Sequence, residues 1–255
     1  NATRCIDTAQ HIALGLDLVT RNVTVNQTIF DPVKAEVCKG LTANEKRDSI
    51  LEQLQMVQDP ESYLHAEWSK HEKLLSELQE LVGTGAAPPI TTLRDHIADG
   101  YYEGGSYVAS QGMIETFILE AGAGLPTAWG ILDGARRREL WSKWQGMNVL
   151  FNRINHGGSH IATRLGGSTI WNILKALEDK GTTGSRIMVG HDTNLDAIAK
   201  LANLQWQCGP FAANGAAPLS GLFFQRVNHS ISVQAVCVRF EGDHVGEVEF
   251  GSVFT

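Results

Sequence analysis

The 255-residue chain is 43% hydrophobic and 19% charged, with a formal net charge of −7 and a pI of about 5.7, which is ordinary for a globular protein. It contains no basic stripe of the kind that binds a nucleic-acid backbone, and its longest apolar runs, such as 114–119, are far too short to cross a bilayer. We therefore expect neither nucleic acid nor a membrane as a partner. The length allows one large domain or a core with a second lobe.

The first residues and the cysteines favour an oxidising compartment. The chain opens on N-A-T-R-C with no signal peptide, as expected of a processed or truncated chain. The even number of cysteines fits two disulfides without requiring them. We expect a secreted or periplasmic protein, and the sequence leaves open whether it is glycosylated. The cysteines are Cys5, Cys38, Cys208 and Cys237, and N-glycosylation triplets begin at Asn1, Asn22, Asn26 and Asn228.

Hydrophobic spacing predicts helices and one strand in the first third of the chain. Apolar residues recur at helical spacing over 8–18, and the β-branched alternation of 22–30 predicts a strand. Amphipathic helices are predicted over 44–58 and 63–82, with Asn44 and Ser62 as candidate N-caps. A linker rich in glycine and proline follows at 83–92.

The middle of the chain is predicted to be helical. We predict helices over 93–101 and 107–120, a turn at 122–130, and further helices over 136–154 and 169–179. Because this region contains no clear strand pattern, we expect residues 39–164 to form a mostly helical lobe.

The C-terminal part changes to β structure. A strand at 187–189 is followed by Gly190 and a helix that ends near residue 201, and 221–227, 232–242 and 246–254 have strand composition. We predict an α/β fold in which residues 1–38 and 165–255 form one sheet domain and 39–164 are inserted. The alternative is a helical scaffold with a small β-rich cap, in which the strands near Asn22 and Ile187 do not share a sheet.

His191 and Asp192 stand where the predicted strand at 187–189 meets a helix. Such a junction exposes backbone N–H groups and the positive end of a helix dipole, which together favour an anion. If both side chains face a phosphoester, Asp192 can protonate the leaving alkoxide and His191 can stabilise the transferred group. The alternative is structural: Asp192 caps the helix and His191 packs.

The string G-H-D-T-N at 190–194 resembles the C-terminal signature of the histidine acid phosphatases, which include phytases and glucose-1-phosphatases. Weaker likenesses follow the family's order along nearly the whole chain: F-D-P-V-K-A-E-V-C at 30–38, the segment 113–132, and G-A-A-P-L-S-G-L-F-F-Q-R-V at 215–227, where Ser220 replaces a glycine. The resemblance implies a phosphoglycerate-mutase-like α/β/α sheet domain with an inserted helical lobe.

The resemblance also implies a mechanism. In that family a histidine of an N-terminal R-H-G-x-R-x-P motif accepts the phosphoryl group. Arg4 and His191 would bind the phosphate and Asp192 would be the general acid; no metal or other cofactor is implied, because guanidinium groups neutralise the phosphate. These 255 residues contain no R-H-G-x-R-x-P string. We therefore expect the nucleophile in a missing N-terminal segment, which leaves open whether this chain alone is active.

Other residues receive weaker predictions. The resemblance places Glu115 and Arg164 near the substrate pocket, with an exposed helix position as the alternative for each. Thr193 is grouped with the substrate-binding residues, and we expect it to orient the turn through local hydrogen bonds. His156, in I-N-H-G-G-S-H, has no arginine around it that matches the motif, so we interpret it as a loop histidine rather than the nucleophile.

Two of the four cysteines are predicted to pair with each other. Cys208 and Cys237 flank a predicted strand pair and are candidates for a disulfide between neighbouring strands. The resemblance pairs Cys38 with a cysteine upstream of Arg4, and Cys5 is the other candidate partner within this chain.

The preferred function is an acid phosphatase that hydrolyses small phosphomonoesters through a phosphohistidine. A phytase is the narrower alternative, although no cluster of lysine and arginine for a heavily anionic ring is evident near the proposed site. A non-catalytic, secreted phosphate-binding protein is the second alternative. The oligomeric state is left open.

Overall fold

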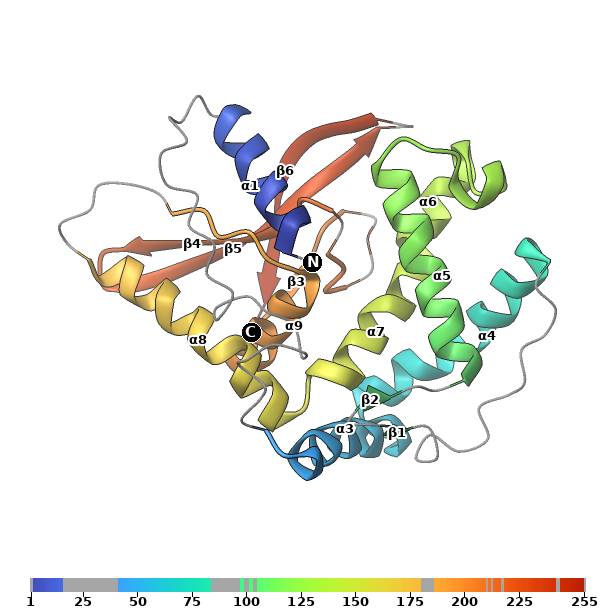
Figure 1. Cartoon of the computed structure of the whole chain (residues 1–255), viewed down its shortest axis with the longest axis horizontal. Helices are drawn as coiled ribbons and strands as arrows, with labels where there is room; N and C mark the ends of the chain where they lie inside the picture. The colour runs from blue at the N-terminus through green and yellow to red at the C-terminus, as the bar shows by residue number, and fades with distance from the viewer. Residues whose placement is uncertain are drawn as a thin grey trace.

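A computed structural model of the chain (Figure 1) describes residues 2–15, 41–83, 97–98, 101–102, 105–179, 186–209, 211, 213–216, 218–241 and 244–254. The predicted strand at 22–30 and Cys38 lie outside these residues. The helices are α1 (Ala2–Gly15), α3 (Ala43–Gln58), α4 (Tyr63–Val82), α5 (Gly105–Gly122), α6 (Arg137–Glu139), α7 (Gln145–His156), α8 (Ser159–Glu178) and α9 (Asp192–Ala202), with short 3₁₀ or π turns η3 (Thr127–Gly130), η4 (Gly134–Arg136) and η5 (Leu140–Trp144). The strands are β1 (Ile97–Ala98), β2 (Tyr101–Tyr102), β3 (Gln205–Gln207), β4 (Gly221–Val227), β5 (Ser230–Glu241) and β6 (His244–Phe254).

The two amphipathic helices predicted over 44–58 and 63–82 are confirmed as α3 and α4. The predicted cap Asn44 is wrong: Thr42 is the N-cap, its Oγ1 accepts the amide of Glu45 (3.2 Å), and Glu45 Oε2 accepts the amide of Thr42 (2.7 Å). This reciprocal pair is a capping box, which satisfies two backbone N–H groups at the helix start. Ser62 caps α4 as predicted, since its Oγ accepts the amide of Leu64 at 3.2 Å.

The helix predicted over 93–101 is wrong. Within that range the structure describes Ile97 and Ala98 as a strand, and they pair antiparallel with Tyr102 and Tyr101. The sequence between the two strands is Asp-Gly, a dipeptide that favours a tight hairpin over a helix. The helix predicted at 107–120 is confirmed as α5, and the one predicted at 169–179 belongs to the longer α8.

The four-stranded sheet has the order β3-β6-β5-β4, and all its strands pair antiparallel. The three strands predicted from composition correspond to β4, β5 and β6. Val227 pairs with Ser230, so Asn228 and His229 form a two-residue turn, and Asn228 has the positive φ (56°) that such hairpins need. The chain combines helices with this sheet, so the predicted α/β class is confirmed, whereas the phosphoglycerate-mutase-like arrangement stays a prediction.

The strand predicted at 187–189 is not observed. Residues 186–190 are neither helical nor paired with any described strand, although the helix predicted after them is confirmed as α9. A strand is defined by a hydrogen-bonded neighbour, and the described part of the chain offers none to this apolar segment. Ile187 is 52% exposed.

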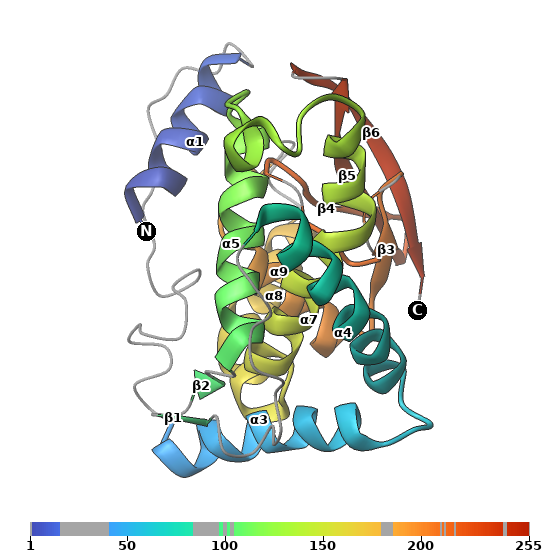
Figure 2. The same cartoon turned by 90° about the vertical axis from the view of Figure 1, so that its right-hand side faces the viewer.

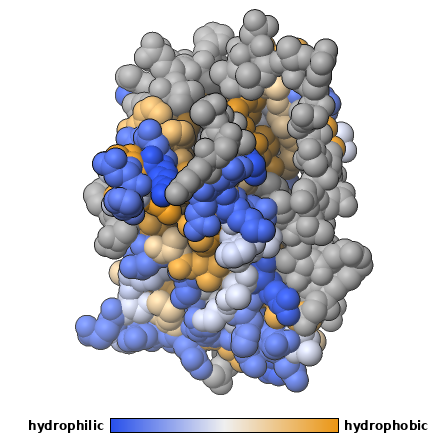
Figure 3. All heavy atoms as spheres, turned by 90° about the vertical axis from the view of Figure 1, so that its left-hand side faces the viewer, coloured by the Kyte–Doolittle hydropathy of each residue, from blue (hydrophilic) through white to orange (hydrophobic). Residues whose placement is uncertain are grey.

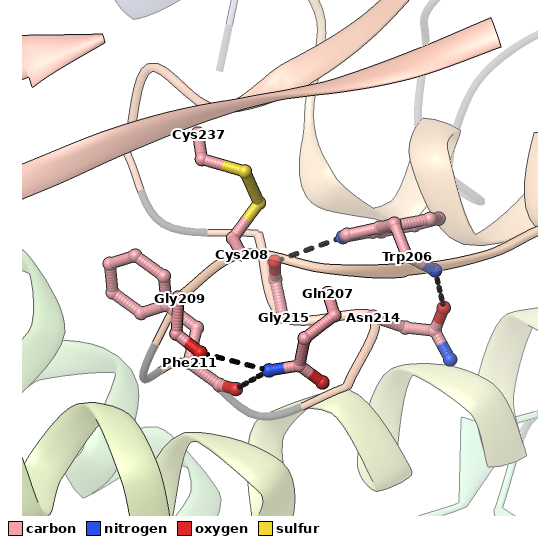
Figure 4. The surroundings of a disulfide bond; sticks show 8 residues. All are labelled: Trp206, Gln207, Cys208, Gly209, Phe211, Asn214, Gly215 and Cys237. Atoms are coloured by element: carbon pink, nitrogen blue, oxygen red, sulfur yellow. Dashed lines mark hydrogen bonds between the residues drawn. A yellow bond between two sulfur atoms is a disulfide. The ribbon is translucent and has the colours of Figure 1, made fainter. Parts of the chain in front are cut away.

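The predicted disulfide between Cys208 and Cys237 is present, with the Cα atoms 5.4 Å apart (Figure 4). It joins the residue after β3 to β5, which are not neighbouring strands as predicted, because β6 lies between them in the sheet. Around it, Trp206 Nε1 donates to the carbonyl of Gly215 (3.1 Å). Gly251 of β6 passes beside the bridge, where a Cβ would lie 2.7 Å from Cys237 Sγ. A side chain at residue 251 would therefore clash with the bridge.

One hydrophobic core connects the helices to the sheet. Trp141 of η5 stacks edge-to-face on Phe211, which follows β3, with ring centroids 5.3 Å apart. Figures 1 and 2 show α7 between α5 and the strands, and α7 packs against both α5 and α9. The face in Figure 3 mixes hydrophilic and hydrophobic residues. No described helix is long and apolar enough to span a membrane.

Candidate active site

The first turn of α9 carries the His191–Asp192 pair. His191 is the N-cap residue in an extended conformation, and Asp192 is the first helical residue. The amide of His191 donates to Asn194 Oδ1 (2.9 Å), while the amide of Asn194 donates to the His191 carbonyl (3.0 Å). Asn194 thus closes the turn and fixes the backbone from which His191 projects.

The Asp192 carboxyl group is held by two N–H donors. Its Oδ1 accepts the amide of Thr193 (2.9 Å), and its Oδ2 accepts the side-chain Nδ2 of Asn152 on α7 (3.0 Å). The amides of Thr193 and Asn194 are therefore used locally, so they are not available to an anion at this helix start. Each carboxyl oxygen keeps a further lone pair, which leaves Asp192 able to exchange a proton with a bound molecule.

The first turn of α1 lies beside His191. Cys5 Sγ is 3.5 Å from His191 Nε2 and 3.7 Å from the carbonyl of Gly190, across 185 residues of sequence. Arg4 precedes Cys5 in the same helical turn. The side chain of Arg4 lies outside the described atoms, so its contact with phosphate stays a prediction.

A small polar crevice of about 10 Å³ lies next to Asp192, with room for about one water molecule. Both acidic residues on one face of α9, Asp192 and Asp196, contribute to it. The remaining lining comes from α7 and from the segment after β3. Its lining residues are Gln145, Asn148, Val149, Asn152, Asp192, Asp196, Asn214 and Ala216.

A buried charged pair lies behind the crevice. Asp196 Oδ1 is 3.9 Å from Nε of Arg153, and both side chains are more than 90% buried. Burial raises the pKa of Asp196 to about 7, a shift that Arg153 opposes and Asp192 reinforces. Arg153 Nη1 also donates to the hydroxyl of Tyr63 at 3.4 Å.

Solved structures with the same fold were found. A Klebsiella sp. ASR1 phytase superposes with a TM-score of 0.67 at 16% identity, over 92% of this chain and 62% of the other. A Citrobacter braakii phytase gives 0.60 at 21%, over 91% and 64%. A Hafnia alvei phytase in complex with myo-inositol hexakis sulphate gives 0.61 at 19%, over 90% and 63%.

This chain has the fold of the bacterial phytases. The resemblance to histidine acid phosphatases, first drawn from G-H-D-T-N, is thereby confirmed at the level of the fold. The chain spans less than two thirds of the length of these phytases. No family model matches the sequence, and no curated relative matches it.

Within the phytase fold, the predicted site residues fall into two groups. Thr193 belongs to the first turn of α9, and its backbone amide donates to Asp192 Oδ1. The expected local hydrogen bonds of its side chain are not observed, because Oγ1 is buried without a partner among the described residues. Glu115 is exposed on α5, and it is not among the described residues that line the crevice. Arg164 is exposed on α8 and interacts electrostatically with Glu45 of α3. The described contacts thus bring Cys5, His191, Asp192 and Thr193 together, and the places of Glu115 and Arg164 relative to the substrate stay predictions.

The interpretation of His156 as a loop histidine is wrong. His156 is the last residue of α7 and is 3% exposed, with Gly157 as the C-cap. Burial lowers its pKa to about 4, although the nearby charge of Asp192 acts in the opposite direction. Its neutral imidazole is thus part of the buried surroundings of Asp192, because α7 packs against α9.

Sequence reasoning missed Asn152, Arg153 and Asp196. The first two belong to the run N-R-I-N-H at 152–156, but the same helix also contains the polar residues Gln145 and Asn148, so the local sequence gives no distinctive signal. Four of these five residues are polar and all five are buried, which requires polar partners within the fold. Among the described residues, no group of three or more histidine, cysteine and acidic side chains could hold a metal ion.

Proposed function

We propose that this chain carries the general-acid and phosphate-binding side of a phosphomonoester hydrolase of the histidine acid phosphatase type. The substrates are phosphorylated small molecules. Arg4 and His191 bind the phosphate oxygens, Thr193 supports the turn at that position, and Asp192 protonates the leaving group. The nucleophilic histidine is expected from an R-H-G-x-R-x-P segment that these 255 residues do not include.

The proposed reaction has two balanced steps. In the first, a histidine nitrogen attacks phosphorus, the bond from phosphorus to the leaving oxygen breaks, and the Asp192 carboxyl group gives its proton to that oxygen. In the second, the Asp192 carboxylate takes a proton from water as the water oxygen attacks phosphorus. The phosphorus–nitrogen bond then breaks, which frees inorganic phosphate and restores both residues.

The single observation that carries the proposal is the position of Cys5 Sγ, 3.5 Å from His191 Nε2. It supports a meeting of the Arg4 helical turn with the His191–Asp192 pair, which one phosphate ion requires. The likeness to the phytase fold supports the same reaction class, but less specifically than this contact does. A guanidinium, an imidazole and a carboxyl group around one tetrahedral anion would supply charge neutralisation and an acid.

The broader architecture remains part of the proposal. We infer a phosphoglycerate-mutase-like sheet domain from residues 1–38 and 165–255, with residues 39–164 as the inserted helical lobe. An extracellular or periplasmic location is supported by the Cys208–Cys237 disulfide. The contributions of Glu115 and Arg164 to substrate binding stay predictions.

The test is the hydrolysis of two phosphomonoesters by the full-length protein that contains this chain. Asp192→Asn keeps the size of the side chain but removes the transferable proton, so we expect turnover of glycerol phosphate to fall roughly 10²- to 10⁴-fold. Turnover of p-nitrophenyl phosphate should fall less, because its leaving group needs little protonation. Equal turnover by the variant and the native protein on both substrates would rule out Asp192 as the acid.

Phytate is the narrower candidate substrate. It is favoured by the phytase neighbours, one of which binds myo-inositol hexakis sulphate. A comparison of kcat/KM for phytate and for glycerol phosphate decides between a phytase and a broad phosphatase. Phosphate binding without turnover of any monoester by the full-length protein would instead support a non-catalytic phosphate-binding protein.

A further inference from the structure

Two consecutive residues of α7 contact two carboxyl groups of α9. Asn152 Nδ2 donates to Asp192 Oδ2 at 3.0 Å, and Arg153 Nε lies 3.9 Å from Asp196 Oδ1. Asp192 and Asp196 are four residues apart, on the same face of α9, and both line the small crevice. The α7–α9 contact therefore provides a separate partner for each carboxyl group.

The two partners differ in charge, and this difference separates the roles of the two acids. A guanidinium favours the ionised carboxylate, because it offers a full positive charge, although at Asp196 burial outweighs this effect and raises the pKa to about 7. A primary amide is neutral, so it can donate to a carboxyl oxygen whether or not the other oxygen carries a proton. Asp196 is 4% exposed and faces the guanidinium, whereas Asp192 is half-buried and faces the amide. A residue that must release and regain a proton in each cycle is suited to the neutral partner.

We propose that Asn152 is a positioning residue for Asp192, whose side-chain amide fixes the carboxyl group in the orientation that delivers the proton to the leaving oxygen. This inference rests on the proposed function of Asp192 as general acid. Asn152 is 7% exposed and is anchored in a buried helix, so its amide has little freedom to move. Together with the amide of Thr193, it supplies a donor to each oxygen of the carboxyl group.

Without the Asn152 amide, one oxygen of Asp192 loses its protein donor and the carboxyl group is free to rotate about its last bond. The charged and titratable groups around it would then determine its orientation. These are Asp196 on α9, Arg153 and His156 on α7, and His191 at the start of α9. A small misplacement of an acid is enough to slow proton transfer strongly.

The test compares Asn152→Leu with Asn155→Leu in the full-length protein. Leucine keeps the branching and the number of heavy atoms of asparagine, although it is larger, and it removes the donor; the same increase in size occurs in the control. Asn155 is a matched control, because it lies on the same helix, is 2% exposed, and its Nδ2 donates to the carbonyl of Phe151 at 3.3 Å. We expect Asn152→Leu to lower kcat for glycerol phosphate roughly 10- to 100-fold beyond the effect of Asn155→Leu, with little change in KM.

A double variant separates this inference from the proposed function. If Asn152 acts through Asp192, Asn152→Leu has no further effect on kcat in an Asp192→Asn background, because the two residues form one unit. Equal kcat values for Asn152→Leu and Asn155→Leu, or additive effects in the double variant, would overturn the positioning role. An Asp192→Asn variant with native turnover would instead overturn the proposed function.

Two further measurements keep the inference testable if the leucine variant does not fold or if turnover is native in Asp192→Asn. The first is the carboxyl ¹³C chemical shift of Asp192 at one fixed pH: loss of the N–H donor to Oδ2 should move this signal in Asn152→Leu, whereas Asn155→Leu should leave it in place. The second is Asn152→Asp, which keeps the shape but donates only when protonated, so its activity should be confined to more acidic pH. An unmoved ¹³C signal in Asn152→Leu, or a native pH profile in Asn152→Asp, would contradict the inference.

Discussion

The buried histidine of α4 provides a quantitative test of how pH acts on this fold. His71 is 4% exposed, and neither ring nitrogen has a hydrogen-bond partner among the described residues. The nearest opposite charge is Glu67 Oε2, 3.8 Å from His71 Nε2 and 42% exposed. Loss of solvation therefore prevails, and burial lowers the pKa of His71 from 6.5 to about 4.

The sign of the effect follows from proton linkage. Between pH 6.5 and about 4 the unfolded chain binds a proton at His71 that the folded chain excludes, so stability is lost as the pH falls through this window. At pH 4.5 the unfolded ring is almost fully protonated. The free-energy cost there is about 2.5 kcal/mol, from two pH units at about 1.4 kcal/mol each, less the small proton occupancy of the folded state.

The experiment is His71→Leu, measured by urea unfolding at pH 7.5 and pH 4.5. Leucine does not titrate, so the stability of the variant relative to the native protein should rise by about 2.5 kcal/mol between the two pH values. His156 and Asp196 titrate in both proteins, so their contributions cancel in the difference. His160→Gln, at an exposed position of α8, is the control. A difference between His71→Leu and the native protein that does not change with pH would refute the reasoning.

Two other predictions concern packing and covalent structure. A Cβ on Gly158 would lie 2.1 Å from the carbonyl oxygen of Ser49, whereas a Cβ on Gly167 of α8 would meet nothing within 4 Å. We expect Gly158→Ala to lower the free energy of unfolding by about 2–3 kcal/mol and Gly167→Ala to raise it by about 0.5–1 kcal/mol. Urea unfolding measures both effects, and equal effects would contradict the close approach of α3 and α8. The disulfide between Cys208 and Cys237 closes a loop of 29 residues, so its replacement by two serines should cost about 3–4 kcal/mol; a thermal unfolding curve unchanged by that replacement would show that the cross-link adds nothing to stability.

The elements predicted correctly are those whose local pattern is strong. The helices α3 and α4 show apolar spacing at the helical period, and β4, β5 and β6 have β-branched and aromatic composition. The error at 93–101 came from giving helical spacing more weight than the Asp-Gly turn signal. The error at 187–189 has another cause: strand formation depends on a neighbour, which local sequence does not reveal.

The sequence predicted only those residues of the candidate site that are adjacent in the chain. His191 and Asp192 are adjacent in the sequence and lie at a helix start, so the motif identifies them. Asn152 is 40 residues away from Asp192 and its role depends on how α7 packs against α9. Nothing in the local sequence fixes that packing, so buried polar residues such as Asn152 and Asp196 become informative only in three dimensions.

The contact between Cys5 and Gly190 spans 185 residues, and this span has a consequence for how the molecule folds. Closing so long a loop costs more chain entropy than forming a contact between neighbouring helices. The contact therefore becomes favourable only after the intervening helices are in place. We therefore expect α1 to dock among the last steps of folding and to detach among the first on mild denaturation. If the site binds phosphate as proposed, that affinity should disappear at denaturant concentrations that leave most of the helical circular dichroism intact.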